Sequence, residues 1–293
     1  IFSRWQQFTT PNLATWQRDV YYYSTDQIIS FPFSAENDHT DVADLFHTQS
    51  FGAGAQSTTH GYQFGGTRES NTTPPYNYGA TIQKFSFTDG SNATDAGDLT
   101  QARATLGGHT SSTHGYATGG GTSPFAGGVN TIEKFPFSSD ANAATVGDLV
   151  VASRFHGSVS STTHGYTIGG ANDDSHYYAT NSITKFSTYN DEHASDVGDL
   201  IGVPQPGGQQ NNDRVGMAGH QDVNDGANYG FVSGGVAGGP SSGANTFSAS
   251  PGSIQRFSFS SDGNATVIGE LGLPNSYNHQ TGLTSPTKGY NIG

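Results

Sequence analysis

The chain has 293 residues, a formal net charge of −13 and no cysteine. The lack of cysteine excludes disulfides, thiolate metal sites and cysteine nucleophiles, and the negative charge disfavours binding to nucleic acid, whose phosphates it repels. Glycine is abundant at 41 residues and aromatic side chains make up 12%, which indicates an all-β protein with many turns rather than a disordered chain. No apolar run approaches the roughly 20 residues needed to span a bilayer, so we expect no membrane insertion.

The N-terminal segment precedes the first repeated element. Residues 1–27 contain Trp5, Trp16 and three consecutive tyrosines. They could supply extra strands to the main domain or form an arm that docks on a partner chain. We therefore expect two parts, residues 1–27 as an arm or extra strands and residues 28–293 as a repeat domain. Because the chain begins at Ile1 and its one methionine is Met217, we expect it to be processed or incomplete at its N-terminus.

From residue 28 onward one phrase recurs. A Thr-His-Gly-Tyr-x-x-Gly-Gly segment is followed by Ile-x-Lys-Phe-x-Phe, by a turn rich in Asp and Asn, and by Gly-Asp-Leu. The Phe-containing strand, with some variation, begins at Ile28, Ile82, Ile132, Ile183 and Ile254. A period of about fifty residues is typical of repeat architectures such as propellers.

Each unit predicts about four strands. Within residues 82–87, Phe85 and Phe87 share one face and Ile82 lies on the other, so both faces are apolar, as in a sheet packed between two neighbours. A Gly-Gly pair after each His-Gly-Tyr strand permits positive φ where the strand ends, and Asp89-Gly90 is a tight-turn signal. These features predict a β-propeller, in which the inserted segments 202–228 and 236–253 of the fourth unit form irregular surface loops.

The Gly-Gly pair, the aromatic strand, the Asn-Ala-Thr turn and the arginines Arg103 and Arg154 resemble kelch repeats, although the usual turn tryptophan is absent. The resemblance implies four-stranded blades. The chain ends at the start of a unit, Gly289–Gly293, and residues 28–33 continue a unit, so we expect the N- and C-terminal strands to pair and close the ring. This closure favours five blades, with six as the alternative if residues 1–27 add strands.

The recurrent histidines and acidic turns are the first candidates for chemistry. His60, His114 and His164 occupy equivalent positions, but Tyr229 and Lys288 fill that position in the other units, so we expect packing rather than a metal ring. The Asp- and Asn-rich turns contain oxygens that can bind Ca²⁺, yet their spacing is not that of an EF-hand and turn capping explains them. No unique pair of carboxylates stands out, so we expect no catalytic residue, metal or cofactor.

The segments between the Gly-Gly strand and the Phe strand vary most and are rich in aromatic residues. Rings among Asn, Asp and Ser suit sugar binding, and the alternative is that they cover blade edges. The inserted fourth unit adds an arginine and a histidine, together with Asp213 and Asp222 as the available carboxylates for polysaccharide degradation. The candidate ligand-binding residues are Tyr76, Tyr78, Phe125, Tyr177, Tyr178, Arg214 and His220.

The copies at 82–99, 113–149 and 162–200 resemble the kelch-like repeats of virion proteins in marine and cyanobacterial bacteriophages. The resemblance implies a non-enzymatic structural or adhesion protein of a phage tail, fibre or surface module, extracellular and part of a homo- or hetero-oligomeric assembly. Its partners would be other virion proteins, contacted through residues 1–27 or loops, and host surface glycans. The alternative is a secreted carbohydrate-binding or polysaccharide-degrading propeller protein.

Overall fold

The computed structural model describes residues 26–30, 40–68, 77–122, 128–171, 179–204, 210–211, 214–222, 228–237, 252–272, 281–284 and 288–292. All regular elements in these ranges are β-strands. None of the described residues forms a helix long and apolar enough to cross a membrane. Nearly all of the N-terminal segment 1–27 lies outside the described residues.

Four antiparallel sheets have four strands each, and we number them as blades in chain order. The first blade comprises β3 (Ala53–Gln56), β4 (His60–Phe64), β7 (Thr81–Ser86) and β8 (Thr94–Asp98). The second comprises β9 (Gly107–Thr110), β10 (His114–Thr118), β11 (Thr131–Pro136) and β12 (Ala144–Asp148). The third comprises β13 (Gly157–Ser160), β14 (His164–Ile168), β15 (Ser182–Ser187) and β16 (Ser195–Asp199). The fourth comprises β20 (Ala218–Gln221), β21 (Tyr229–Ser233), β23 (Ser253–Ser258) and β24 (Thr266–Glu270).

Two further hairpins lie at the ends of the chain. β1 (Gln27–Ser30) pairs with β2 (Thr40–Asp44), and β25 (Thr281–Thr284) pairs with β26 (Gly289–Ile292). Short pairs extend the loops, namely β5 (Thr67–Arg68) with β6 (Asn77–Tyr78), β17 (Val203–Pro204) with β18 (Gln210–Asn211), and β19 (Arg214–Val215) with β22 (Val236–Ala237). Strands therefore occur inside 202–228 and 236–253, so the prediction that these segments are wholly irregular is wrong.

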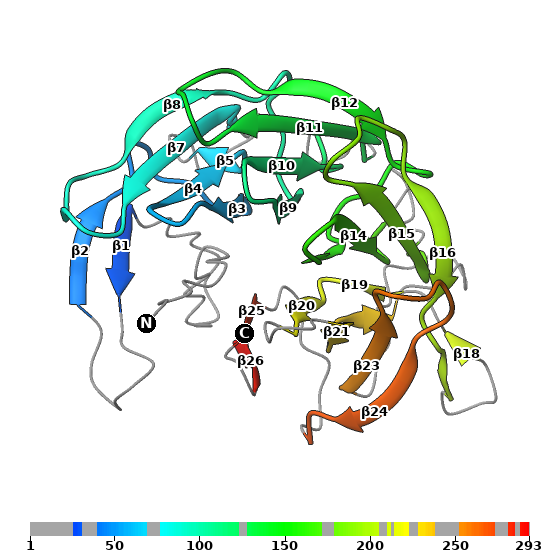
Figure 1. The fold of residues 1–293 in the computed structure, drawn as a ribbon. Coiled ribbons are helices and arrows are strands. Elements are labelled where there is room, and N and C mark those ends of the chain that lie inside the picture. The colour runs from blue at the N-terminus through cyan, green and yellow to red at the C-terminus, as the bar shows by residue number, and fades with distance from the viewer. Residues whose placement is uncertain are drawn as a thin grey trace.

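The blades are arranged around a common centre (Figure 1). The first strands of successive blades, β3, β9, β13 and β20, are neighbours, and β25 follows β20. The outermost strands β2, β8, β12, β16 and β24 lie on the periphery. This is a β-propeller, as the sequence predicts. In the described residues β1 pairs with β2 alone and β26 with β25 alone, so the closing strand pair and the number of blades stay predictions.

Aromatic side chains fill the space between blades. Tyr62 of the first blade packs on Phe135 and Phe137 of the second, with ring centroids 5.5 and 4.9 Å apart. Tyr166 of the third blade packs in the same way on Phe257 and Phe259 of the fourth, at 5.3 and 4.9 Å. On the opposite face of the Phe strand, the first three blades bury an isoleucine completely, namely Ile82, Ile132 and Ile183, and Ile254 of the fourth blade is half-buried. Both faces of these strands are therefore apolar because each sheet is covered on both sides.

A second link between blades runs through the backbone just before each innermost strand. Phe51, Thr105 and Phe155 have φ of 58°, 58° and 55°, and Gly216 occupies the same position with φ of 68°. The N–H of each of the last three donates to the carbonyl of its counterpart in the preceding blade, at 2.8 Å from Thr105 to Phe51, 2.9 Å from Phe155 to Thr105 and 2.8 Å from Gly216 to Phe155. Left-handed backbone costs a non-glycine residue about 1 kcal/mol, and these inter-blade bonds offset that cost.

The repeated Gly-Asp-Leu and Asn-Ala-Thr segments form one inter-blade clamp. The N–H of Asp98 donates to Oδ1 of Asn142 in the next blade at 3.0 Å, and its carbonyl accepts from the N–H of Ala143 at 2.8 Å. The same pair of bonds recurs from Asp44 to the first blade, from Asp148 to the third, where His193 replaces Asn, and from Asp199 to the fourth. Because Asp44 is held as the others are, β1–β2 is the outer hairpin of a blade.

Arg103 and Arg154, the two arginines that resemble those of kelch repeats, occupy adjacent positions of the repeat. Ser50, Ala104 and Arg154 make equivalent bridges to Thr67, Gly121 and Ala171. Arg103 therefore corresponds to Ser153, the residue before Arg154. The Arg103 side chain is fully buried, with Nη2 3.2 Å from Oε1 of the equally buried Glu133.

Candidate functional site on the turn face

One end of the propeller carries two sets of short turns. The turns between the first and second strands and those between the third and fourth strands lie at the same end of each blade, because successive strands are antiparallel. We call this end the turn face. The second strand of each blade ends, and the third begins, at the opposite end.

The recurrent histidines stand at the start of the second strand in the first three blades. Nδ1 of His60, His114 and His164 lies 2.8 Å from Oγ1 of the preceding threonine in each case. The backbone N–H of each histidine donates to a serine Oγ three residues earlier, at 3.0 Å. Burial lowers the pKa of His114 and of His164. These contacts support a local structural role, and within the described ranges no three His, Asp or Glu side chains gather as a metal site.

On the turn face, a Lys–Asp ion pair joins each of three successive pairs of neighbouring blades. Lys134 in the second blade holds Asp191 in the third, with Nζ 2.6 and 2.9 Å from the two carboxylate oxygens. Lys84 pairs with Asp140, and Lys185 pairs with Asp262 at 2.5 Å. In the fourth blade the series changes, and Arg256 places Cζ 4.5 Å from the centroid of the Tyr229 ring.

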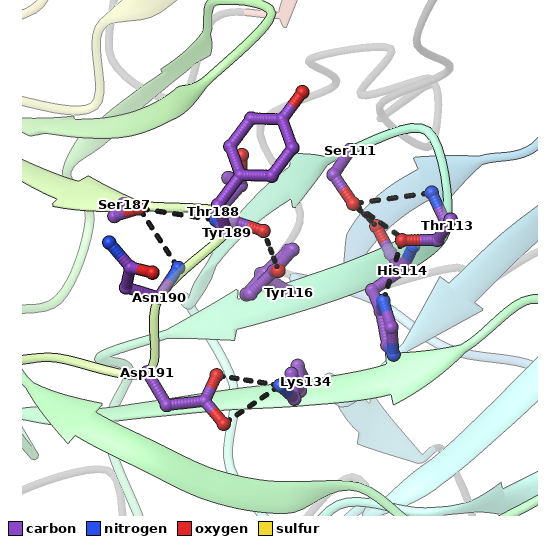
Figure 2. A network of polar contacts seen from close by, with 10 residues as sticks. All are labelled: Ser111, Thr113, His114, Tyr116, Lys134, Ser187, Thr188, Tyr189, Asn190 and Asp191. Carbon is purple, nitrogen blue, oxygen red and sulfur yellow. Dashed lines mark hydrogen bonds and ion pairs between the residues drawn. The ribbon is translucent and has the colours of Figure 1, made fainter.

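The boundary between the second and third blades presents an exposed aromatic ring among these polar contacts (Figure 2). The Tyr116 hydroxyl donates to the carbonyl of Thr188 at 2.8 Å. Oγ of Ser187 accepts from the N–H groups of Tyr189 and Asn190, at 3.1 and 3.0 Å. The turn is thus held at three points, while the side chain of Tyr189 is 73% exposed.

Tyr189 departs from the repeat. The corresponding positions in the other complete blades are Thr88, Ser138 and Ser260. The turn bond is the same without the ring, since the N–H of Thr88 donates to Ser86 Oγ at 3.2 Å and that of Ser260 to Ser258 Oγ at 3.1 Å. Tyr189 is not among the residues predicted from the sequence, because it lies in an Asp- and Asn-rich turn of the kind that turn capping explains. The available signal was a tyrosine at a position that otherwise holds Ser or Thr.

The predicted ligand-binding residues do not meet at one place in the described structure. Tyr76, Phe125, Tyr177 and Tyr178 lie outside the described residues, as does Asp213. Tyr78 lies in β6, half-buried, opposite Thr67 of β5. Arg214 begins β19, where the structure describes its backbone. Their proposed contacts with a ligand stay predictions.

His220 lies in strand β20 rather than in a surface loop, and it is only 7% exposed. Its Nε2 lies 2.9 Å from Ser233 Oγ on the adjacent strand β21. A small polar pocket beside it is lined by residues of the innermost strands β13, β20 and β25, among them Ser158, Gln221 and Thr284. The prediction of an irregular loop is wrong here, because His220 fills the interior between innermost strands.

Two other histidines are core residues that the sequence analysis did not identify. Nδ1 of His109 lies 3.1 Å from the carbonyl of Val159, and its Nε2 lies 3.1 Å from Thr118 Oγ1. Thr118 Oγ1 also lies 3.3 Å from Nε2 of His156. Burial lowers the pKa of His109 to about 4 and that of His156 to about 3, so both are neutral near pH 7.

Comparisons with known proteins bear on the fold. No protein-family model matches the sequence, and no curated protein does. A solved structure titled "Structure of YjhT" superimposes with a TM-score of 0.69 at 12% sequence identity, covering 88% of this chain and 81% of that one. At this identity the likeness establishes the β-propeller fold and carries no function.

Proposed function

We propose that this chain is a non-enzymatic surface-adhesion protein whose rigid propeller displays its turn face and loops to glycans. One observation carries the proposal. The recurrent titratable residues of the turn face hold turns and blade boundaries together, whereas Tyr189, which breaks the repeat there, presents an exposed ring. An exposed aromatic ring on a rigid turn offers a flat apolar face on which a ligand can stack.

The links between blades support a display function. Adjacent blades share backbone bonds near the axis, aromatic packing in the middle and the Asp–Asn clamp at the periphery. Blades that are linked near the axis, in the middle and at the periphery hold surface side chains in fixed positions. Such side chains lose less conformational entropy when a ligand binds to them.

The setting is proposed from the resemblance of the repeats to phage virion proteins. It would place the chain outside the cell, on a tail, fibre or capsid surface, in contact with other virion proteins. Immunogold labelling of purified particles with an antibody against this chain tests the setting. We expect labelled particles, and labelling confined to the soluble fraction of a lysate would contradict a virion position without affecting glycan binding.

The alternative is a secreted propeller that degrades polysaccharide. Of the two candidate carboxylates for this chemistry, Asp213 and Asp222, Asp222 lies within the described residues. Incubation of the purified chain with soluble polysaccharides, followed by affinity gel electrophoresis and a reducing-end assay, separates the two functions. We expect retarded migration without new reducing ends. An enzyme would instead release reducing ends. Asp222→Asn would abolish that release, and the control Asp196→Asn would leave it intact.

A further inference from the structure

We propose that Tyr189 is the stacking platform of a carbohydrate site at the boundary of the second and third blades, and that its ligand is the pyranose ring of a neutral sugar. This inference rests on the proposed function and names the residue that would carry it. Three properties of the turn support it: the ring is fixed and exposed, the scaffold does not need it, and its surroundings favour an uncharged ligand.

The ring is presented by a rigid turn. Two N–H groups of the turn donate to Ser187 Oγ at 3.1 and 3.0 Å, and the Thr188 carbonyl accepts from Tyr116 of the neighbouring blade at 2.8 Å. Ser187 and Thr188 are buried while Tyr189 is 73% exposed. In Figure 2 the ring stands clear of the strands, on the side of the turn away from the Lys134–Asp191 pair. A ring on a fixed backbone loses little freedom when a ligand covers it.

Folding alone does not account for the tyrosine. The other complete blades form the same turn with Thr88, Ser138 and Ser260, and the bond from the turn N–H to a serine Oγ has nearly the same length in the first and fourth blades. A large exposed aromatic group contributes no core burial at this position. A local departure from the repeat without a structural gain is expected at a functional site.

The surroundings favour a neutral polar ligand. Asp191, two residues along the chain from the ring, is neutralised by Lys134 across the boundary through contacts of 2.6 and 2.9 Å. The exposed acidic Glu192 follows it in the same turn, so an anionic sugar would be repelled. The exposed Asn190 next to the ring offers an amide donor and acceptor. The electron-rich ring face attracts the partially positive C–H groups of a pyranose, by the same quadrupole that favours edge-to-face aromatic contacts. A sugar presents both surfaces, C–H groups for the ring and hydroxyls for the amide.

The test uses the whole chain with three neutral polysaccharides as probes, a β-glucan, a galactan and a mannan, in affinity gel electrophoresis. Tyr189→Ser restores the residue type of the other blades, so we expect unchanged thermal unfolding. We expect it to weaken binding to the recognised polymer by about tenfold or more, equivalent to about 1.4 kcal/mol. Tyr189→Phe keeps the ring and is expected to retain affinity within about threefold, because stacking needs the face and not the hydroxyl.

A matched control moves the ring to another blade. Ser260→Tyr in the Tyr189→Ser background presents a tyrosine on the equivalent turn of the fourth blade, and we expect no recovery of binding. Full recovery would show adhesion to any exposed ring and would overturn the assigned site. Equal binding by wild type and Tyr189→Ser would overturn the platform while leaving the adhesion function standing. Failure of the wild type to bind any of the three polymers, or binding confined to a cationic polymer such as chitosan, would overturn the neutral-glycan ligand itself.

Discussion

At the scale of single residues, the glycine of each His-Gly-Tyr segment is required by a contact. It lies directly opposite the first phenylalanine of the next strand, as Gly165 lies opposite Phe186. A Cβ at Gly61, Gly115, Gly165 or Gly230 would come within 2.2 to 2.3 Å of Cζ of that phenylalanine. The outer end of the phenylalanine ring lies against the glycine, and a larger residue would clash with it.

Replacing Gly165 by alanine tests this close approach. The new Cβ would lie 2.3 Å from Phe186 Cζ and 3.1 Å from His109 Nδ1, so we expect a loss of about 1–3 kcal/mol in the free energy of unfolding, as for other overpacked cores. Gly157→Ala in the same blade is the control, because its Cβ meets no atom closer than 3.6 Å. Urea unfolding measures both, and equal stabilities of the two variants would contradict the packing argument.

The buried histidines predict how stability depends on pH. The unfolded chain binds protons near pH 6.5, whereas the folded state keeps His109 and His156 neutral down to pKa values of about 4 and about 3. The unfolded state therefore binds more protons below pH 6.5, and the free energy of unfolding falls as the pH drops, by up to about 1.4 kcal/mol per pH unit for each histidine.

Replacing His156 by leucine should remove one of the protons that the unfolded chain takes up below pH 6.5. The neighbouring blades hold Leu106 and Met217 at the equivalent position, so the side chain should fit. We expect a shallower decline of stability between pH 6.5 and 4, measured by urea unfolding across that range. Gly157→Ala, which changes no titratable group, should leave the slope unchanged. A His156→Leu slope identical to that of wild type would contradict the burial of a neutral imidazole.

At the scale of elements, the third strand of a blade is joined to the end of the preceding blade by a polar side chain near its start. Glu133 of β11 accepts from the N–H of Thr100 at 3.0 Å, and Gln255 of β23 accepts from the N–H of Ile201 at 2.8 Å. Glu133 also bears the Arg103 ion pair at 3.2 Å. Nε and Nη1 of Arg103 have no hydrogen-bond partner within the described residues, so this guanidinium depends on one carboxylate.

A double-mutant cycle tests the coupling of Arg103 and Glu133. Glu133→Gln leaves a buried guanidinium without a counter-ion, and we expect a loss of about 3–5 kcal/mol. The first blade holds Gln49 and Gln83 at the two equivalent positions, so Arg103→Gln combined with Glu133→Gln should recover most of that stability. Chemical denaturation of the two singles and the double gives the coupling energy. Additive losses would show that the two side chains act independently.

At the scale of the whole molecule, the two terminal hairpins hold the positions expected of the inner and outer halves of one blade. β25 follows β20 as an innermost strand, and β2 is clamped by Asn92 as an outermost strand. In the complete first blade Tyr62 of β4 lies opposite Lys84 of β7. By that register, closure of the ring would place Tyr290 of β26 opposite Ser30 of β1.

A crosslink tests closure in solution. Because the chain has no cysteine, Ser30→Cys with Tyr290→Cys introduces a single thiol pair, and opposed residues of paired strands lie within reach of a disulfide. We expect the oxidised monomer to migrate faster than the reduced monomer on a non-reducing gel. The control pair, Ser30→Cys with Thr284→Cys, places its second cysteine on β25 and should give no such species. Crosslinked dimers in place of monomers would show that the terminal hairpins pair between two chains.

The sequence by itself determined the periodic part of this protein. The alternation of Phe85 and Phe87, the Gly-Gly pairs and the Asp-Asn turns act through local backbone geometry and two-residue periodicity, so the repeat pattern alone predicts the blades and the packing between them. It does not predict the register of Arg103, because that register depends on which residue forms the bridge to Gly121. It also does not predict the strands inside the fourth unit, because these depend on pairing between distant segments.

Only the tertiary structure decided which residues are exposed and which are buried. His109, His156 and His220 lie far apart in the chain and are ordinary polar residues in the sequence, yet all three are buried in the fold. Tyr189 is one of many aromatic residues in the sequence, and it becomes a candidate binding group because the turn beneath it is held by Ser187 and Tyr116 while its own ring remains 73% exposed. Burial depends on contacts between blades, and these are long-range in the sequence, whereas the pattern that forms each blade is local.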